Sequence, residues 1–165
     1  ERAGEVMGRL VPYVDVLIAN EEDAKDVFGI EAADTDIMGG KLNHEGYVSV
    51  ARQLTERFGC KAVAITLRGS ISASENNWAG MLYTGGQPFF SQNYLIRLVD
   101  RVGGGDSFGG GLIHALCKGM DEQSTIEFAV AASCLKQTIE HDFNLVSEKE
   151  VLALMGGNAS GRVQR

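Results

Sequence analysis

Six glycines lie within twelve residues of this chain, in the triplets Gly103–Gly105 and Gly109–Gly111. Glycine carries no Cβ, so a run of three leaves backbone N–H groups without side-chain cover. The first triplet precedes a helix that we expect from about Asp106 to Lys118, and a helix start adds partial positive charge to such amides. The segment therefore predicts an anion site. Inside the helix each glycine costs up to about 1 kcal/mol relative to alanine, so the second triplet predicts close packing against a ligand or a neighbouring element.

Apolar runs alternate with helical patterns along the rest of the chain. Two short runs, at 15–19 and 60–66, are bounded by polar residues, which is typical of strands buried on both faces. The spacing of apolar residues predicts further helices near 3–11, 20–29, 46–58, 121–138 and 147–155, short strands near 78–83 and 95–99, and a turn at 67–70. We find no internal repeat and no linker, so this order predicts a single α/β layered unit.

Charge and composition exclude several classes of function. The 165 residues include 22 acidic and 15 basic side chains, a net charge of −7, and no basic stripe, so a nucleic-acid partner is not expected. No apolar run approaches the roughly eighteen residues of a membrane span, and no signal peptide is recognisable. Three widely spaced cysteines without a CxxC pair fit a reducing, cytoplasmic setting. Because helical spacing begins at once and the first residue is not Met, we expect the chain to be part of a longer gene product.

Asp106 directly follows the first glycine triplet. A carboxylate repels bound phosphate, so at an anion site it makes chemical sense as the acceptor of a hydroxyl proton during phosphoryl transfer. The alternative is an ordinary helix N-cap. Two common phosphate loops do not fit: a Walker A loop would need Lys and Ser or Thr at Gly111 and Leu112, and a GxGxxG loop would need glycine at Phe108.

The segment from Asp100 to Gly111 resembles the C-terminal signature of the ribokinase-like (PfkB) carbohydrate kinases, an Asp, two variable residues, Gly-Ala-Gly-Asp and then small residues. Gly104 takes the alanine position. Two other segments are similar to motifs of that family and come in its order: Asn20–Asp23 to Asn-x-x-Glu, which organises Mg²⁺, and Ala64–Ser70 to a strand-to-loop segment that approaches the nucleotide. The resemblance covers nearly the whole chain, as the C-terminal half of such a kinase.

This resemblance implies an α/β fold of the ribokinase type, a partial and mostly parallel sheet flanked by helices. Residues 1–165 would form the C-terminal nucleotide-binding and catalytic part, and the N-terminal half with the substrate and lid elements would lie elsewhere. The implied cofactors are ATP and Mg²⁺, with a monovalent cation left open. The implied partners are a small sugar acid and ATP, without nucleic acid or membrane, and a homo-oligomer is left open.

The resemblance also implies roles for individual residues. Asp106 would be the base for the sugar hydroxyl, and the anion hole and nucleotide contacts would come from Gly103, Gly104, Gly105, Thr66, Arg68, Gly69 and, near adenine, Ala132. Magnesium would be placed by Asn20 with Asp23, which replaces the usual Glu, or with Glu22. A favourable acidic first turn of a helix is the alternative for these acidic residues. We expect His114 to be an ordinary helix residue.

Within the family the chain most resembles 2-dehydro-3-deoxygluconate kinases, on the segments Leu135–Thr138, Asp142–Ser147 and Gly161–Arg165. His141 stands where this resemblance predicts glycine, and Val130 where some relatives carry Asn near adenine. The expected function is ATP-dependent phosphorylation of a sugar hydroxyl, on 2-dehydro-3-deoxygluconate. The alternatives are another sugar or nucleoside, such as fructose or ribose, and a nucleotide-binding module without turnover.

Overall fold

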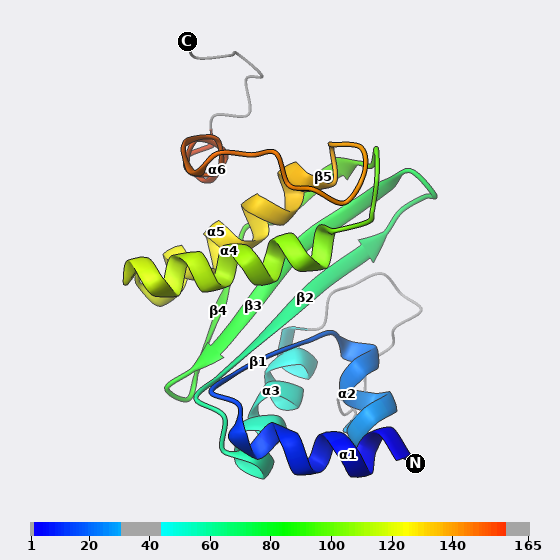
Figure 1. Ribbon diagram of the computed structural model, residues 1–165, viewed down its shortest axis with the longest axis vertical. Helices are drawn as coiled ribbons and strands as arrows, with labels where there is room; N and C mark the ends of the chain where they lie inside the picture. Colours follow the sequence, from blue (N-terminus) through cyan, green and yellow to red (C-terminus); the bar gives the residue numbers. More distant parts are fainter. Residues whose placement is uncertain (1, 31–43, 158–165) are drawn as a thin grey trace.

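The computed structural model describes residues 2–30 and 44–157 (Figure 1). The elements in chain order are α1 (Arg2–Leu10), the 3-10 turn η1 (Val11–Tyr13), β1 (Val16–Ala19), α2 (Glu21–Phe28), α3 (His44–Phe58), β2 (Ala62–Ser70), β3 (Glu75–Thr84), β4 (Gln87–Phe90), β5 (Tyr94–Arg97), α4 (Gly104–Lys118), α5 (Glu122–Lys136) and α6 (Glu148–Met155). The expected α/β class is confirmed. The segment Gly161–Arg165 lies outside the described residues.

The described strands form one mixed sheet in the order β1-β2-β3-β4, with β5 also paired to β3. Strands β1 and β2 are parallel, with Ala19 opposite Ile65. The pairs β2–β3, β3–β4 and β3–β5 are antiparallel. The expected parallel character therefore holds for one described strand pair, and β1 forms one edge of the described sheet.

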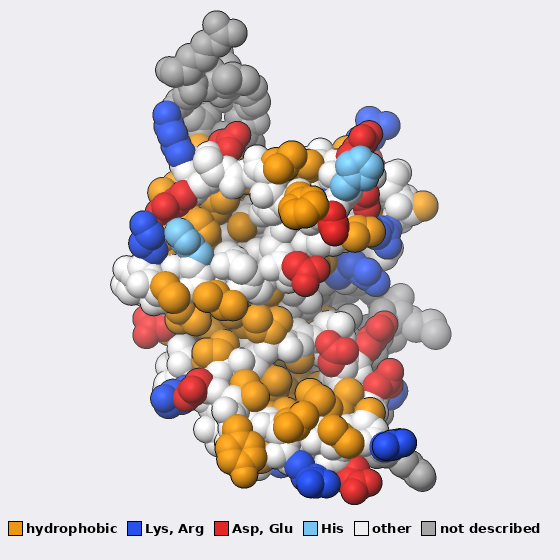
Figure 2. Space-filling view, in the orientation of Figure 1, with side chains coloured by type: hydrophobic (Ala, Val, Ile, Leu, Met, Phe, Trp, Pro, Cys, Tyr) orange, Lys and Arg blue, Asp and Glu red, His pale blue; other side chains and the backbone are white. Residues whose placement is uncertain are grey.

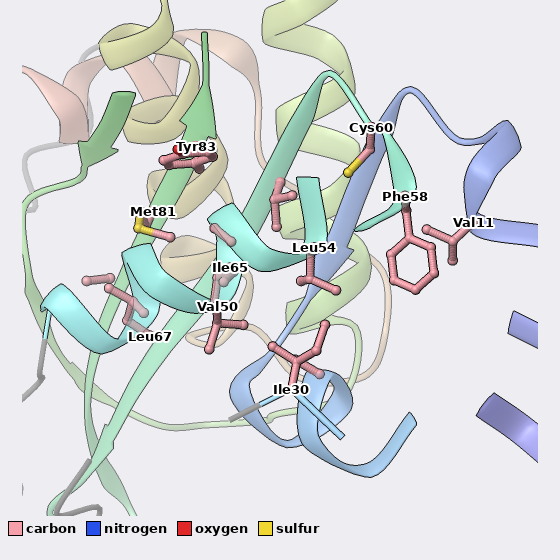
Figure 3. Close-up of a cluster of buried hydrophobic side chains, with 14 residues drawn as sticks. Val11, Ile30, Val50, Leu54, Phe58, Cys60, Ile65, Leu67, Met81 and Tyr83 are labelled. Atoms are coloured by element: carbon pink, nitrogen blue, oxygen red, sulfur yellow. The ribbon is translucent and has the colours of Figure 1, made fainter. Parts of the chain in front are cut away.

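Helices cover both faces of the sheet, with α1, α2 and α3 on one side and α4 and α5 on the other (Figure 1). Side chains of β2 alternate between the two layers, as the two-residue period of a strand requires. Ile65 and Leu67 pack with Val50 and Leu54 of α3 and with Met81 of β3 (Figure 3). This cluster fixes the first helical layer.

The opposite face of β2 carries small residues, and α4 and α5 pack onto it. Ala62 and Ala64 share a buried cluster with Phe108, Leu112 and Val130. Small side chains on the sheet leave room for the large ones on the helices, so the two layers interdigitate.

Glycines let α4 approach its neighbours closely. A Cβ at Gly111 would lie 3.0 Å from Ala129 Cα of α5, one at Gly109 would lie 3.5 Å from Ile18 Cδ1 of β1, and one at Gly110 would meet nothing within 4 Å. The close packing expected for the second triplet is therefore confirmed at Gly111, whereas a Cβ at Gly109 would make an ordinary van der Waals contact. The contact with Ile18 also sets the first turns of α4 beside β1.

The turn expected at 67–70 is wrong. These residues continue β2, where Leu67 pairs with Ala79 and Ser70 with Asn76, and the chain reverses only afterwards. The residue types from Arg68 to Ser70 are those of a turn, but the ladder with β3 supplies backbone hydrogen bonds that local sequence does not reveal. Both Arg68 and Gly69 therefore lie in a paired strand.

Apolar side chains remain on the surface over α1 and over α4 (Figure 2). Helix α1 buries none of its residues. The exposed large apolar side chains of these regions include Val6, Met7, Leu10, Tyr13, Ile113 and Leu116. None of the helices in the part of the chain that the structure describes could cross a lipid bilayer.

Candidate active site

Helix α4 begins in a backbone conformation that glycine adopts readily. Its N-cap, Gly103, has φ +76°, in the left-handed region. A Cβ at this position would also run into the backbone carbonyl of Asp142. The glycine loop, residues 99–105, is thus in backbone contact with the turn at residues 139–142, which we call the His141 turn.

Several amides at the start of α4 are open. The first N–H groups of an α-helix have no partner within the helix. The amide of Gly104 donates to the Arg101 carbonyl at 3.2 Å, so one amide of the expected anion hole is already engaged. No described residue accepts a hydrogen bond from the amides of Gly103, Gly105 or Asp106. With the helix dipole, these amides can stabilise an anion.

A groove of about 380 Å³ extends from this helix start. Asp106, Gly110 and His114 line it along one face of α4, and Ala132 of α5 lies in its wall. Positions 106 and 114 are eight residues apart, which is about 12 Å along a helix. The structure therefore brings Asp106, which is exposed, and Ala132 into one groove.

The end of the groove away from Asp106 is more apolar. Phe128 of α5 and Val151 of α6 are buried and line it. The His114 ring stacks on Phe128 with centroids 5.1 Å apart, and its Nε2 lies 3.5 Å from Glu148 Oε2. His114 packs as an ordinary helix residue, as expected, and in addition lines the groove. The open amides at the start of α4 near one end and the Phe128 ring at the other suit a ligand with an anionic end and a flat apolar end, with the Asp106 carboxylate placed to take part in chemistry.

Asp100 ties the glycine loop to the His141 turn. Its carboxylate accepts hydrogen bonds from the amides of Val102 and His141, both at 3.0 Å. The bond from Val102, followed by that from His141 and the charge of Lys136, holds the pKa of Asp100 below its usual value. The carboxylate stays ionised at neutral pH and keeps both bonds.

His141 is the non-glycine residue with positive φ, +66°, in the described part of the chain. Side chains with a Cβ adopt this region at a cost. The sequence resemblance predicts glycine at this position, and the backbone conformation explains why glycine suits it. The His141 amide nevertheless reaches Asp100.

Thr66, Arg68 and Gly69 lie along β2, opposite Gly80, Trp78 and Asn77 of β3. By strand alternation Thr66 and Arg68 share the face of the sheet that α4 and α5 cover, whereas Gly69 belongs to the opposite face. None of the three lines the groove. Their contact with a nucleotide stays a prediction.

Asn20 and Asp23 form a reciprocal cap at the start of α2. Asn20 Oδ1 accepts from the Asp23 amide at 2.8 Å, and Asp23 Oδ2 accepts from the Asn20 amide at 3.0 Å. Asp23 therefore stabilises the first turn of α2, as the alternative predicts, through a capping box with Asn20. The exposed carboxylate of Glu22 makes no interaction with a described residue.

The described residues hold no cluster of three or more His, Cys, Asp or Glu side chains that could bind a metal by themselves. Mg²⁺ in phosphoryl-transfer sites is held by one or two carboxylates together with phosphates and water. Glu22 fits such a partial set, with Asn20 and Asp23 beside it. Their role towards Mg²⁺ stays a prediction.

Residues that sequence reasoning did not assign to the site form much of the groove wall. They are Phe128, residues 142–144, Val146, Glu148 and Val151. Asp106, Gly110 and His114 are spaced four residues apart, so the sequence could have placed them on one face of the helix. No sequence signal placed α6 and the segment before it against α4, because that contact joins positions far apart in the chain.

Comparison with known proteins assigns this geometry to a family. Residues 2–140 match the profile of the pfkB family carbohydrate kinases. The chain belongs to this family. The crystal structure of 2-dehydro-3-deoxygluconokinase from Thermotoga maritima superposes with a TM-score of 0.87 and 48% sequence identity, covering 94% of this chain and 45% of that chain. The resemblance inferred from the motifs and the ribokinase-like fold are thereby confirmed.

Two other relatives extend the comparison. The 2-dehydro-3-deoxygalactonokinase of Haloferax volcanii is 28% identical over 152 residues, 92% of this chain and 41% of that protein. A Ribokinase II from E. coli, in complex with ATP and Mg²⁺, shares the fold with a TM-score of 0.67 at 16% identity, covering 93% of this chain and 42% of that chain. The chain spans less than half the length of these relatives.

A matched pair of substitutions tests the backbone contact at the glycine loop. We expect Gly103→Ala to lower the free energy of unfolding by about 1–2 kcal/mol from the left-handed backbone alone, and further from the contact with the Asp142 carbonyl. Gly105→Ala has open space around its Cβ and should leave stability unchanged or raise it by up to about 1 kcal/mol. Urea unfolding measures both. Equal stability of the two variants would contradict the described loop conformation.

A second substitution tests the conformation of the His141 turn. We expect His141→Gly to raise the free energy of unfolding by up to about 1 kcal/mol, because relief of the left-handed conformation outweighs the added entropy of the unfolded chain. Glu140→Gly is the control, since Glu140 does not have positive φ, and it should be destabilising. Thermal or urea unfolding distinguishes the two. Destabilisation by both to the same degree would show that the turn is not strained at His141.

Proposed function

We propose that the chain carries the nucleotide-binding and catalytic residues of an ATP-dependent kinase that phosphorylates the sugar acid 2-dehydro-3-deoxygluconate. The observation that carries this proposal is the exposed carboxylate of Asp106, which lines the end of the groove. It directly follows the open amides of Gly103 and Gly105 in the chain, although these glycines are not among the described residues that line the groove. A base and an anion site next to one another are what phosphoryl transfer to an alcohol requires.

In the proposed reaction the hydroxyl oxygen of the sugar acid attacks the γ-phosphorus of ATP. Asp106 accepts the hydroxyl proton, the new O–P bond forms, and the bond from the γ-phosphorus to the bridging oxygen breaks, so that ADP leaves. The open amides at the start of α4 stabilise the negative charge on the transferred group. Mg²⁺, when bound, neutralises phosphate charge. Glu22, with Asn20 and Asp23, would hold it on the protein side.

The nucleotide would lie along the groove with its phosphates at Asp106. Its base would then reach the part lined by Ala132 and Phe128, about two helical turns away. The described lining of the groove includes the carboxylates of Asp106, Asp142 and Glu148 and no lysine or arginine. An anionic ligand would therefore need the amides at the start of α4 and a bound metal cation to offset the repulsion. The relative from E. coli in complex with ATP and Mg²⁺ supports this choice of ligand.

The choice of sugar rests on relatives. The protein from Thermotoga maritima, at 48% identity, is a 2-dehydro-3-deoxygluconokinase, and that from Haloferax volcanii is a 2-dehydro-3-deoxygalactonokinase. Both names describe sugar acids of one chemical class. Because this chain covers less than half of either relative, sugar contacts from outside the chain are part of the proposal.

Asp106→Asn tests the role of the proposed base. In the full-length gene product we expect kcat to fall by about 10²–10⁴-fold, the usual contribution of a general base, while the Kd for Mg·ATP measured by calorimetry changes little. Asp15→Asn, at an exposed aspartate that does not line the groove, is the control and should retain near wild-type turnover. Turnover of Asp106→Asn within about threefold of wild type would remove Asp106 from the mechanism.

A substrate series tests the proposed specificity. With an ADP-coupled assay we expect kcat/KM for 2-dehydro-3-deoxygluconate to exceed that for fructose, ribose or adenosine by at least about 10²-fold, the discrimination that unsatisfied polar contacts produce. A larger value for one of the other acceptors would assign that acceptor instead. Binding of Mg·ATP without ADP release for any acceptor would show a nucleotide-binding module without turnover.

A further inference from the structure

Lys136 is the one charged side chain in the described ranges that is buried, with 0% of its surface exposed. It lies in the last turn of α5 and does not line the groove. An ammonium group removed from water must be compensated by nearby negative charge or hydrogen bonds. Its surroundings therefore show what the charge does.

The ammonium group contacts the His141 turn directly. Lys136 Nζ donates to the carbonyl of Ile139 at 3.1 Å. The Ile139 amide in turn donates to the Lys136 carbonyl at 3.0 Å. The turn is thus held to the end of α5 by one backbone and one charged hydrogen bond, close to the negative end of the helix dipole.

The His141 turn, which Lys136 contacts, is bonded in turn to the glycine loop through the Asp100 carboxylate. The positive charge of Lys136 also contributes to lowering the pKa of Asp100. That carboxylate receives the amides of Val102, in the glycine loop, and His141, in the His141 turn. Lys136 therefore acts on the His141 turn directly and on the glycine loop through that turn.

Neighbours of Lys136 on α5 hold the glycine loop as well. Ser133 Oγ donates to the Gly104 carbonyl at 2.7 Å in a buried position. The Gln137 carbonyl accepts the amides of Val99 at 2.9 Å and Asp100 at 3.3 Å. The end of α5 thus supports the glycine loop through these hydrogen bonds, and Lys136 is the charged residue at this end of the helix.

We propose that Lys136 is a positioning residue for the phosphate-binding site: its buried ammonium holds the His141 turn through Ile139, and Asp100 joins that turn to the glycine loop, so that the start of α4 with its open amides keeps its position. The proposal rests on the proposed function and assigns that function a residue outside the groove. A methionine of similar length would pack in the same space without a desolvation penalty, so packing alone does not account for a lysine here.

The test compares Lys136→Met with Asp100→Asn and the double variant, and Lys149→Met on the exposed surface of α6 is the matched control. Hydrogen exchange read by NMR reports the amides of Val102 and His141, with Ile65 in the sheet core as internal reference. We expect at least about tenfold faster exchange of the Val102 and His141 amides in Lys136→Met and Asp100→Asn, with Ile65 unchanged.

Nucleotide affinity gives the second measurement. We expect Lys136→Met and Asp100→Asn each to raise the Kd for Mg·ATP by about tenfold or more, and the double variant to be clearly less affected than the product of the two single effects, because both act through one interaction. In Lys136→Ala, ammonium chloride should restore affinity, whereas tetramethylammonium chloride, which is too large for the vacated space, should not. The surface control Lys149→Met should match wild type.

The outcomes separate the inference from the proposed function. Faster exchange at Val102, His141 and Ile65 alike would show that Lys136 only stabilises the fold and would overturn the inference. Unchanged exchange in Lys136→Met, or fully multiplicative effects in the double variant, would overturn it as well. If the wild-type chain binds no Mg·ATP, the proposed function fails, while local exchange still decides whether Lys136 positions the loop. Should Lys136→Met not fold, Asp100→Asn, at the half-buried acceptor of both amides, carries the same exchange test.

Discussion

The contact between two stretches of backbone at Gly103 is the constraint on which the site depends. The Asp142 carbonyl occupies the space that a side chain at position 103 would need. This close approach sets where α4 begins, and the start of α4 determines which amides are open and where the Asp106 carboxylate lies. The groove wall contributed by residues 142–146 is fixed by the same contact. A phosphate site made of neutral amides requires such rigidity, because dipoles stabilise charge well only when they are already oriented.

Local chemistry made much of the fold predictable. Asn20 and Ser147 cap their helices as their residue types indicate, and Gly29 and Gly119 end α2 and α4 in the left-handed conformation. The Asp106 segment and its helix could be located for the same reason, since glycine and helix-start signals act within a few residues. The placement of Asp106 and Ala132 in one groove agrees with roles assigned from family resemblance, although those roles stay predictions.

Features that depend on distant partners could not be predicted. Leu67–Ser70 has turn-like residues and forms a strand because β3 pairs with it. Gly104 was expected among the open amides, yet its N–H is engaged by Arg101, a neighbour whose carbonyl direction depends on the loop conformation. The sequence of α6 predicts an amphipathic helix but does not indicate which element it packs against. Its position in the groove wall beside α4 could therefore not be predicted. The buried position of Lys136 was equally hidden, because an isolated lysine in a last helical turn is ordinarily exposed.

The described residues that line the groove all lie between Asp106 and Val151 in the sequence. No residue of β1, at one edge of the described sheet, or of α1 is among those lining residues. The exposed apolar side chains over α1 are therefore separate from the groove. With the nucleotide in this groove, as proposed, the sugar acceptor can be recognised by a different region of the protein. Sugar preference can then diverge among homologues while the nucleotide machinery is inherited unaltered.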